Sequence, residues 1–140
     1  MPYEVKATPV AQRQLAGLRG LRRKALDAFV ATLVNEGCHA LAYRLSGHEP
    51  LPRLCVQHLR AKDRVVVAFE GATAWVLLVG PHDEGDRRTD VYTALYQLAG
   101  VDPPEVPRTK PPCCDEDDQP PTADDRVLDD FVRRARSLHR

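Results

Sequence analysis

Hydrophobic residues in the first third of the chain follow the spacing of one short strand and two helices. Residues 3–7 alternate between apolar and polar, and Thr8 and Pro9 then supply a favoured N-cap and a favoured first residue of a helix. Apolar residues recur three and four positions apart over 21–36, and Gly37 ends this segment. The pattern predicts an N-terminal strand followed by a helical hairpin.

After the helices, the spacing of apolar residues changes to every second position. We expect strands at 40–45, 53–60, 64–70 and 73–79, separated by short polar turns. A short helix should follow over 90–98. The predicted fold class is α+β: the N-terminal strand and the helical hairpin precede an antiparallel three-strand meander, which completes a four-stranded sheet.

The C-terminal part of the chain differs from this body in composition. Residues 101–123 are rich in proline and include the acidic run 115–118, which is typical of a linker without a packed core. Residues 124–140 have acidic side chains first and basic ones last, as suits a helix dipole. One face of this helix carries Val127, Leu128, Phe131, Val132, Ala135 and Leu138. We predict a domain at 1–100, a linker at 101–123 and an amphipathic helix at 124–140. This helix docks on the body, docks on a protein partner, or stays a disordered tail.

Length and charge narrow the class of protein. The 140 residues fit one domain, and no segment approaches the ~18 apolar residues that a membrane span needs. The start of the chain lacks the apolar region of a signal peptide, so we expect a cytoplasmic protein with no membrane association. The net charge is zero, yet residues 1–100 carry 13 Lys and Arg against 10 Asp and Glu, and the remainder carries 7 against 10. A mildly basic body with an acidic extension is a pattern to test for nucleic-acid binding.

Four cysteines show neither a C-x-x-C pair nor the density of a disulfide framework. Cys38 and Cys55 are expected to be reduced, partly buried apolar residues, because free cysteines are often buried. The adjacent Cys113 and Cys114 lie in the Pro/Asp-rich segment, where they could bind a metal or sense redox state. No group of His, Cys and carboxylate residues has ligand spacing, so we expect no metal and no cofactor.

A hairpin in the middle of the chain gathers basic residues. With a turn at 61–63, Arg60 is expected opposite Arg64, with His58 two residues along on the same face and Lys62 at the tip. Two arginines opposite each other either point into water or hold an anion between them. The other face of the hairpin is apolar and predicts a core beneath the helices; it carries Cys55, Leu59, Val65, Val67 and Phe69.

The next strand and the loop after it add further candidates. Trp75 should lie opposite Ala68, with Leu77 and Val79 on the face of Arg64, and its ring either stacks on a nucleobase or is half-buried. His82 either exchanges protons near neutral pH or is only a turn residue, and Tyr92 on the following helix offers a second donor or acceptor. Arg87 and Arg88 are further cations of this loop.

These residues resemble the RelE/ParE toxin superfamily over roughly residues 3–98. The segment 59–66 (LRAKDRVV) is similar to the family's L-R-x-G-D-Y-R-V-x-Y, and 45–47 (LSG) also matches. Val79-Gly80 and 90–92 (DVY) look like the family's V-G-x-R…[DE]-V-Y. The predicted order of strand, helical hairpin, antiparallel strands and short helix is the layout of these toxins, so the resemblance implies a RelE-like fold.

The resemblance also implies a function, namely the toxin of a type II toxin–antitoxin module. RNA-cutting members of the family are metal-independent endoribonucleases, in which a ribose 2′-hydroxyl attacks the neighbouring phosphate. The implied catalytic residues here are Arg60, Arg64, His82 and Tyr92, and the implied RNA-binding residues are His58, Lys62, Trp75, Arg87 and Arg88. The implied partners are an antitoxin protein and mRNA, on or off the ribosome.

Two alternatives stay open. One is a non-catalytic, ParE-like poison of a DNA topoisomerase, and the other is a domesticated member that only binds a partner. The basic trio His58, Arg60 and Arg64, together with His82 and Tyr92, favours the endoribonuclease, because a non-cutting member needs no convergent proton donors. The neutral net charge favours the alternatives.

Overall fold

The computed structural model describes residues 2–104 and 109–138 as an α+β fold around one five-stranded sheet. The strands are β1 (Glu4–Ala7), β2 (Tyr43–Arg44), β3 (Leu54–His58), β4 (Asp63–Glu70) and β5 (Thr73–Pro81). Their order in the sheet is β1-β5-β4-β3-β2, with β1 parallel to β5 and the other pairs antiparallel. The α+β class is confirmed. The expected four-stranded sheet has a fifth strand because the short strand β2 pairs with β3.

The helices are α1 (Pro9–Ala16), α2 (Gly20–Glu36), α3 (Val91–Ala99) and α4 (Asp125–Leu138). Thr8 caps α1 by accepting a hydrogen bond from the backbone N–H of Ala11. Gly37 and Gly100 follow α2 and α3 with positive φ angles of 57° and 73°. The strand expected at 40–45 begins only at Tyr43, because residues Gly37–Ala40 continue α2 as a 3₁₀ turn.

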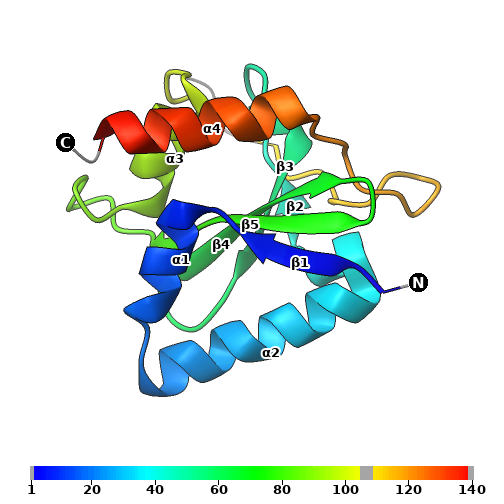
Figure 1. Ribbon diagram of the computed structural model, residues 1–140, viewed down its shortest axis with the longest axis horizontal. Coiled ribbons are helices and arrows are strands. Elements are labelled where there is room, and N and C mark those ends of the chain that lie inside the picture. Colours follow the sequence, from blue (N-terminus) through cyan, green and yellow to red (C-terminus); the bar gives the residue numbers. More distant parts are fainter. Residues whose placement is uncertain (1, 105–108, 139–140) are drawn as a thin grey trace.

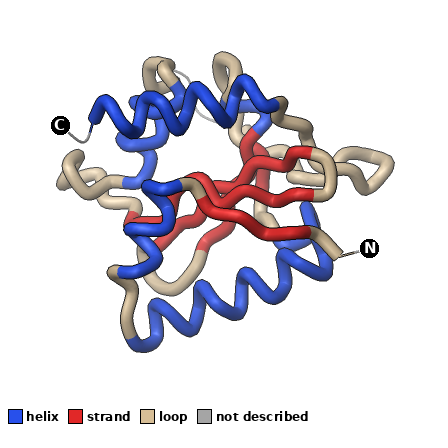
Figure 2. The backbone as a smooth tube through the Cα atoms, viewed as in Figure 1, coloured by secondary structure: helices blue, strands red, loops and turns tan. Residues whose placement is uncertain are grey.

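Helices cover the sheet on both faces (Figures 1 and 2). The α1/α2 side buries one set of alternate residues of β4, including Val65, Val67 and Phe69. The α3/α4 side buries the other set, including Val66 and Ala68. The predicted apolar core face is therefore confirmed beneath α1 and α2, whereas the opposite face is also covered along most of its length.

An irregularity in the β4–β5 pairing changes which side chains share a face. Val66 pairs with Leu78 but Val67 pairs with Val76, so Leu77 is an extra residue in β5. Leu77 and Leu78 both join the core under α3 and α4, and Val79 points to the α1/α2 side. The expectation that Val79 shares the face of Arg64 is therefore wrong, because the extra residue shifts the alternation.

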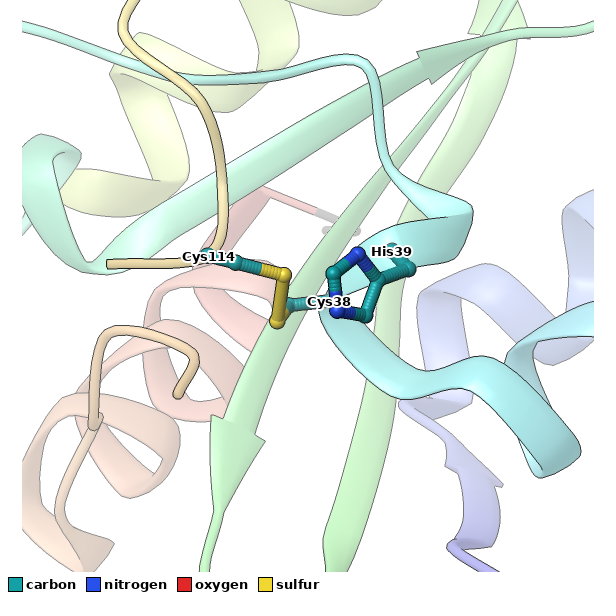
Figure 3. Close-up of side chains that lie close together, drawn as sticks. All are labelled: Cys38, His39 and Cys114. Carbon is teal, nitrogen blue, oxygen red and sulfur yellow. A yellow bond between two sulfur atoms is a disulfide. The ribbon is translucent and has the colours of Figure 1, made fainter. Parts of the chain in front are cut away.

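All four cysteines form disulfides, Cys38 with Cys114 and Cys55 with Cys113. The expectation of reduced cysteines is wrong because their separation along the chain does not reveal that the fold brings β3 and the turn after α2 beside residues 113–114. Figure 3 shows the Cys38–Cys114 bond next to His39, whose Nε2 lies 3.4 Å from an oxygen of Asp118. Both sulfurs of this group are bonded to each other, so neither is a thiolate that could bind a metal.

Residues after Gly100 contribute to the core. Cys113 and Ala123 are each 1% exposed, although they lie in the segment expected to be a linker without packing. Helix α4 packs on α3 and α1 through Leu128, Phe131 and Ala135, and Figure 1 shows it crossing the sheet on the side opposite α2. The side chain of Leu138 and residues 105–108 of the expected linker lie outside the described residues. The division at 100 and 123 stays a prediction, but the parts that are described pack together.

None of the helices described here is long and apolar enough to cross a membrane. The cytoplasmic location stays a prediction.

The packing of α4 on the body can be tested through Phe131, whose side chain is buried. Phe131→Ala should lower the free energy of unfolding by about 3–5 kcal/mol, because it removes a fully buried ring and leaves a cavity against α3. Arg126→Ala, an exposed change on the same helix, should stay within about 0.5 kcal/mol. Chemical denaturation of the oxidised protein measures both. Equal stability of the two variants would contradict the packing of α4.

Candidate active site

A cluster of polar residues lies at the end of the sheet where the β3–β4 hairpin, the end of β5 and the start of α3 meet. His58 on β3 pairs directly with Arg64 on β4, and His82 follows β5. Together with residues from β2, α3 and the 109–119 segment they line a cavity of about 300 Å³, which we call the histidine cavity. Its lining residues are Tyr43, His58, Arg64, His82, Tyr92 and Lys110.

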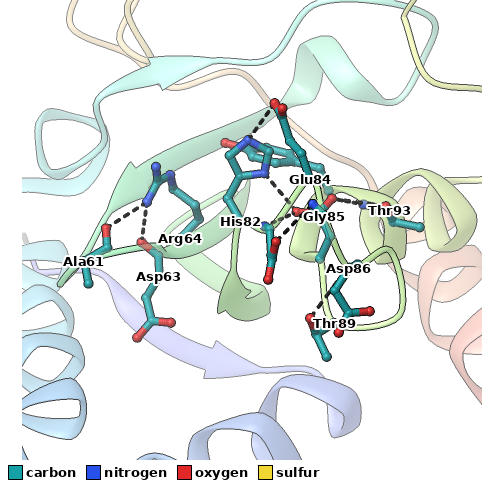
Figure 4. Close-up of polar contacts among 12 residues, drawn as sticks. Ala61, Asp63, Arg64, His82, Glu84, Gly85, Asp86, Thr89 and Thr93 are labelled. Atoms are coloured by element: carbon teal, nitrogen blue, oxygen red, sulfur yellow. Dashed lines mark hydrogen bonds and ion pairs between the residues drawn. The ribbon is translucent and has the colours of Figure 1, made fainter.

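Arg64 is anchored on the hairpin turn (Figure 4). Its Nη1 donates to the carbonyl oxygens of Ala61 at 3.3 Å and Asp63 at 3.1 Å. The turn itself is fixed from the other side, because the buried carboxylate of Asp63 accepts two hydrogen bonds from Arg22 at 2.7 and 2.8 Å. Nη2 of Arg64 has no hydrogen-bond partner among the described residues, so this end of the guanidinium can bind an anion in the cavity.

His82 is oriented by a buried carboxylate. Its Nδ1 lies 2.8 Å from Oδ1 of Asp90, the N-cap residue of α3. Asp90 also accepts hydrogen bonds from the backbone N–H of Asp83 and from the backbone and hydroxyl of Thr93. Burial alone would raise the pKa of Asp90, but the bonds from His82, Asp83 and Thr93 outweigh it and hold that pKa below its usual range. Asp90 is therefore ionised at neutral pH, and Nδ1–H of His82 donates to it. Nε2 on the other side of the ring lies 3.5 Å from a carboxylate oxygen of the exposed Glu84 (Figure 4).

His58 has a different electrostatic environment. Its pKa is lowered, first by burial and then by the positive charges of Arg64 and Lys110 and by His82. A lowered pKa keeps the imidazole neutral at pH 7, so His58 can accept a proton. The cavity is thus lined by a histidine that can accept a proton, His58, and by a histidine that a carboxylate orients, His82, with Arg64 beside them.

Two buried tyrosines, Tyr43 and Tyr92, line the same cavity as His58, His82 and Arg64. The hydroxyls of Tyr43 and Tyr92 share a hydrogen bond of 2.9 Å, and both side chains are buried. The ring of Tyr92 meets that of His82 edge-on, with centroids 4.8 Å apart. The ring of Tyr43 meets that of His58 in the same way at 6.1 Å. Each imidazole thus lies edge-on to a buried tyrosine ring of the same cavity.

The structure brings four of the predicted site residues together: His58, Arg64, His82 and Tyr92. The expected pairing of Arg60 with Arg64 is wrong, because the turn comprises 59–62 and shifts the register by two residues. Arg60 and Lys62 are consequently exposed in the turn and do not line the histidine cavity. The backbone carbonyl of Lys62 instead accepts a hydrogen bond from the N–H of His82 at 2.8 Å, which ties the turn to the loop after β5.

The remaining predicted residues lie outside this cavity. Arg87 lines a neighbouring cavity of about 500 Å³, which shares His82 and Tyr92 with the first, and Arg88 is exposed in the same loop. Trp75 pairs with Ala68 as expected, but it is near the start of β5, whereas His82 follows the end of this strand. Its indole N–H lies 3.4 Å from Glu70, and its ring lies beside α4. RNA-binding roles for these residues stay predictions.

Three residues of the site were not identified from the sequence. Asp90 could have been found, since an Asp that directly precedes a helix is a favoured N-cap and follows His82 in the same loop. Tyr43 could be recognised from the sequence only as a residue of a strand, without any indication of a functional role. Lys110 could not be recognised at all, because it lies in a proline-rich segment with no regular pattern.

Structures of RelE toxins are similar to this chain. The RelE–RelB complex of the archaeon Pyrococcus horikoshii matches with 18% identity and a TM-score of 0.46, over 61% of this chain and 100% of that chain. A free double mutant of the Escherichia coli toxin RelE matches with 17% identity and a TM-score of 0.46, over 61% and 88%. The RelBE2 toxin–antitoxin complex of Mycobacterium tuberculosis matches with 24% identity and a TM-score of 0.43, over 56% and 96%. No family model and no curated protein matches the sequence.

The charges around His58 generate a titration test. Arg64→Gln removes a positive charge that lowers the pKa of His58, so this pKa should rise toward its usual value of 6.5. Arg60→Gln makes the same charge change in the exposed turn and should leave the titration of His58 unaltered. Nuclear magnetic resonance of the imidazole ring protons measures both variants. An equal response to the two changes would contradict the register of the hairpin.

Proposed function

We propose that this chain is the toxin of a toxin–antitoxin pair and a metal-independent endoribonuclease that cuts mRNA. The observation that supports this proposal best is the pair of histidines around Arg64, one kept neutral and the other held by a carboxylate. An acid and a base on opposite sides of a phosphate are what transesterification of RNA requires. The motifs that resemble RelE toxins include Arg64, Asp90 and Tyr92 of this site.

In the proposed reaction, a phosphodiester lies in the histidine cavity, and its negatively charged oxygens accept hydrogen bonds from the guanidinium of Arg64. His58 removes the proton of the ribose 2′-hydroxyl, whose oxygen then forms a bond to the adjacent phosphorus. The bond from phosphorus to the 5′-oxygen breaks, and His82 gives a proton to this leaving oxygen from Nε2. The products are a 2′,3′-cyclic phosphate and a 5′-hydroxyl, so all atoms and protons balance without a cofactor.

Arg64 would stabilise the charge that develops on the phosphorane. Removal of one such donor typically costs about 2.7–4 kcal/mol, or ~10²- to 10³-fold in kcat. The larger cavity beside Arg87 shares His82 and Tyr92 with the histidine cavity, and it would offer space for the neighbouring nucleotide. An antitoxin that covers these two cavities would block the substrate, and this is the surface where we place that partner.

A cleavage assay tests the proposal. The purified, oxidised protein should cut mRNA in the presence of EDTA and leave 2′,3′-cyclic phosphate ends. His58→Ala should lower kcat by about 10²- to 10⁴-fold, since it removes the general base, and Arg64→Gln by ~10²- to 10³-fold. Arg23→Gln, an exposed change on α2, is the control that should retain activity.

Other outcomes would contradict the nuclease. Cleavage that EDTA abolishes and Mg²⁺ restores would exclude the 2′-hydroxyl mechanism of side chains alone. Intact RNA together with growth arrest and halted DNA replication on induced expression would favour the topoisomerase poison instead. Intact RNA without growth arrest would favour a partner-binding protein.

A further inference from the structure

The segment 109–119 is held beside the histidine cavity by two disulfides and by hydrogen bonds from Arg44. Cys113 and Cys114 form the disulfides to Cys55 and Cys38. Arg44 on β2 adds two hydrogen bonds, from its backbone N–H to the carbonyl of Pro111 at 2.7 Å and from Nη2 to the carbonyl of Cys113 at 3.2 Å. Cys55 and Cys113 are both buried, so the anchor lies in the core rather than on the surface.

This segment carries Lys110 into the cavity. The Nζ of Lys110 lies 5.2 Å from the centroid of the Tyr43 ring, and the side chain lines the cavity with His58 and Arg64. No ion pair with a carboxylate involves Lys110 among the described residues. A second cation therefore faces the same space as Arg64, without an acidic partner that would neutralise it.

The position of Lys110 depends on the anchor at Cys113. Only three peptide units separate the two residues, so their Cα atoms lie within about 11 Å of each other. Without the disulfides, residues 109–119 would still be held by the two hydrogen bonds from Arg44 and by the ion pair of His39 with Asp118. A long flexible segment lowers the local concentration of any group that it carries. The disulfides of the oxidised chain thus restrict the position of the Lys110 ammonium group. In the reduced chain this group would move over a larger volume.

We propose that Lys110 is a phosphate-binding residue of the histidine cavity and that the Cys55–Cys113 and Cys38–Cys114 disulfides hold it in place. This inference rests on the proposed phosphodiester substrate. The site is then complete in the oxidised chain and weakened in the reduced one. Reduction of each disulfide takes two electrons and two protons from a dithiol, which becomes a disulfide itself, and yields two cysteine thiols. Disulfides in cytosolic proteins are commonly transient and redox-sensing, so such a dependence would link activity to the redox state of the compartment.

The test uses binding of an RNA trinucleotide whose 2′-hydroxyls are replaced by hydrogen, measured by calorimetry with EDTA throughout. In the oxidised chain, Lys110→Gln should weaken binding at least about tenfold, the factor for one charge-assisted hydrogen bond. Lys24→Gln, an exposed lysine of α2, is the control and should bind like the wild type. Dithiothreitol should weaken binding by the wild type by a similar factor and have little further effect on Lys110→Gln.

A second measurement reports the position of Lys110 without a ligand. Because the charge of Lys110 lowers the pKa of His58, that pKa should rise both in Lys110→Gln and on reduction of the wild type. Circular dichroism checks that the reduced chain keeps its fold. A pKa of His58 that reduction leaves unchanged would overturn the role of the disulfides.

The outcomes separate this inference from the proposed nuclease. Cleavage of RNA that does not depend on Lys110 would overturn the inference and leave the nuclease standing. Binding of the trinucleotide that depends on Lys110, without cleavage by any form, would support the inference and overturn the nuclease. Absence of both binding and cleavage would overturn both.

Discussion

The apolar character of both faces of the sheet is the constraint on which the rest of the structure depends. Every residue from Val65 to Phe69 is buried, so alternate side chains of β4 enter two separate cores. A sheet of this kind needs a layer of helices on each side. The first layer comes from α1 and α2, and the second from α3 together with α4. The C-terminal helix is therefore needed to complete a layer, which explains why a chain with a proline-rich, acidic segment returns to the body.

Covering both faces leaves the polar end of the sheet as the place where chemistry can occur. The apolar run of three neighbouring strands gives way there to His58, Arg64 and Gly80, which lie in register. Helix α3 begins at the same place, and its N-cap Asp90 serves two purposes. It accepts the hydrogen bond of the Thr93 backbone N–H in the first turn of the helix, and it orients His82. The residue that caps the start of α3 thus also positions the imidazole of His82.

Local patterns in the sequence predicted most of the elements, because the signals for them are local. Thr8 and Pro9 at the start of α1 and the glycines at 37 and 100 are read within a few residues of the ends that they set. The alternation of β4 likewise predicted which residues face α1 and α2. The predicted pairing of Arg60 with Arg64 was wrong because the register depends on the length of the turn, and the composition of the turn does not determine that length.

The parts that could not be predicted depend on contacts distant in sequence. The extra residue at Leu77 leaves no local signal in a run of apolar residues, and it reversed the side to which Val79 points. The disulfides join residues 76 and 58 positions apart, which spacing rules for short motifs do not address. Lys110 lies only three residues from Cys113, so its place in the candidate site likewise depends on contacts distant in sequence. Prediction from the sequence therefore found His58, Arg64, His82 and Tyr92. It missed Tyr43, Asp90 and Lys110, and only Lys110 lies on the segment that the disulfides hold.

Binding of substrate at the polar end of the sheet is tested most directly by the backbone and side-chain resonances of the oxidised protein. We expect the 2′-deoxy trinucleotide to shift the signals of His58, Arg64, His82 and Lys110 and to leave the indole N–H of Trp75, near the other end of β5, unchanged. Shifts centred on Trp75 and α4, with those of both histidines unaltered, would contradict the account.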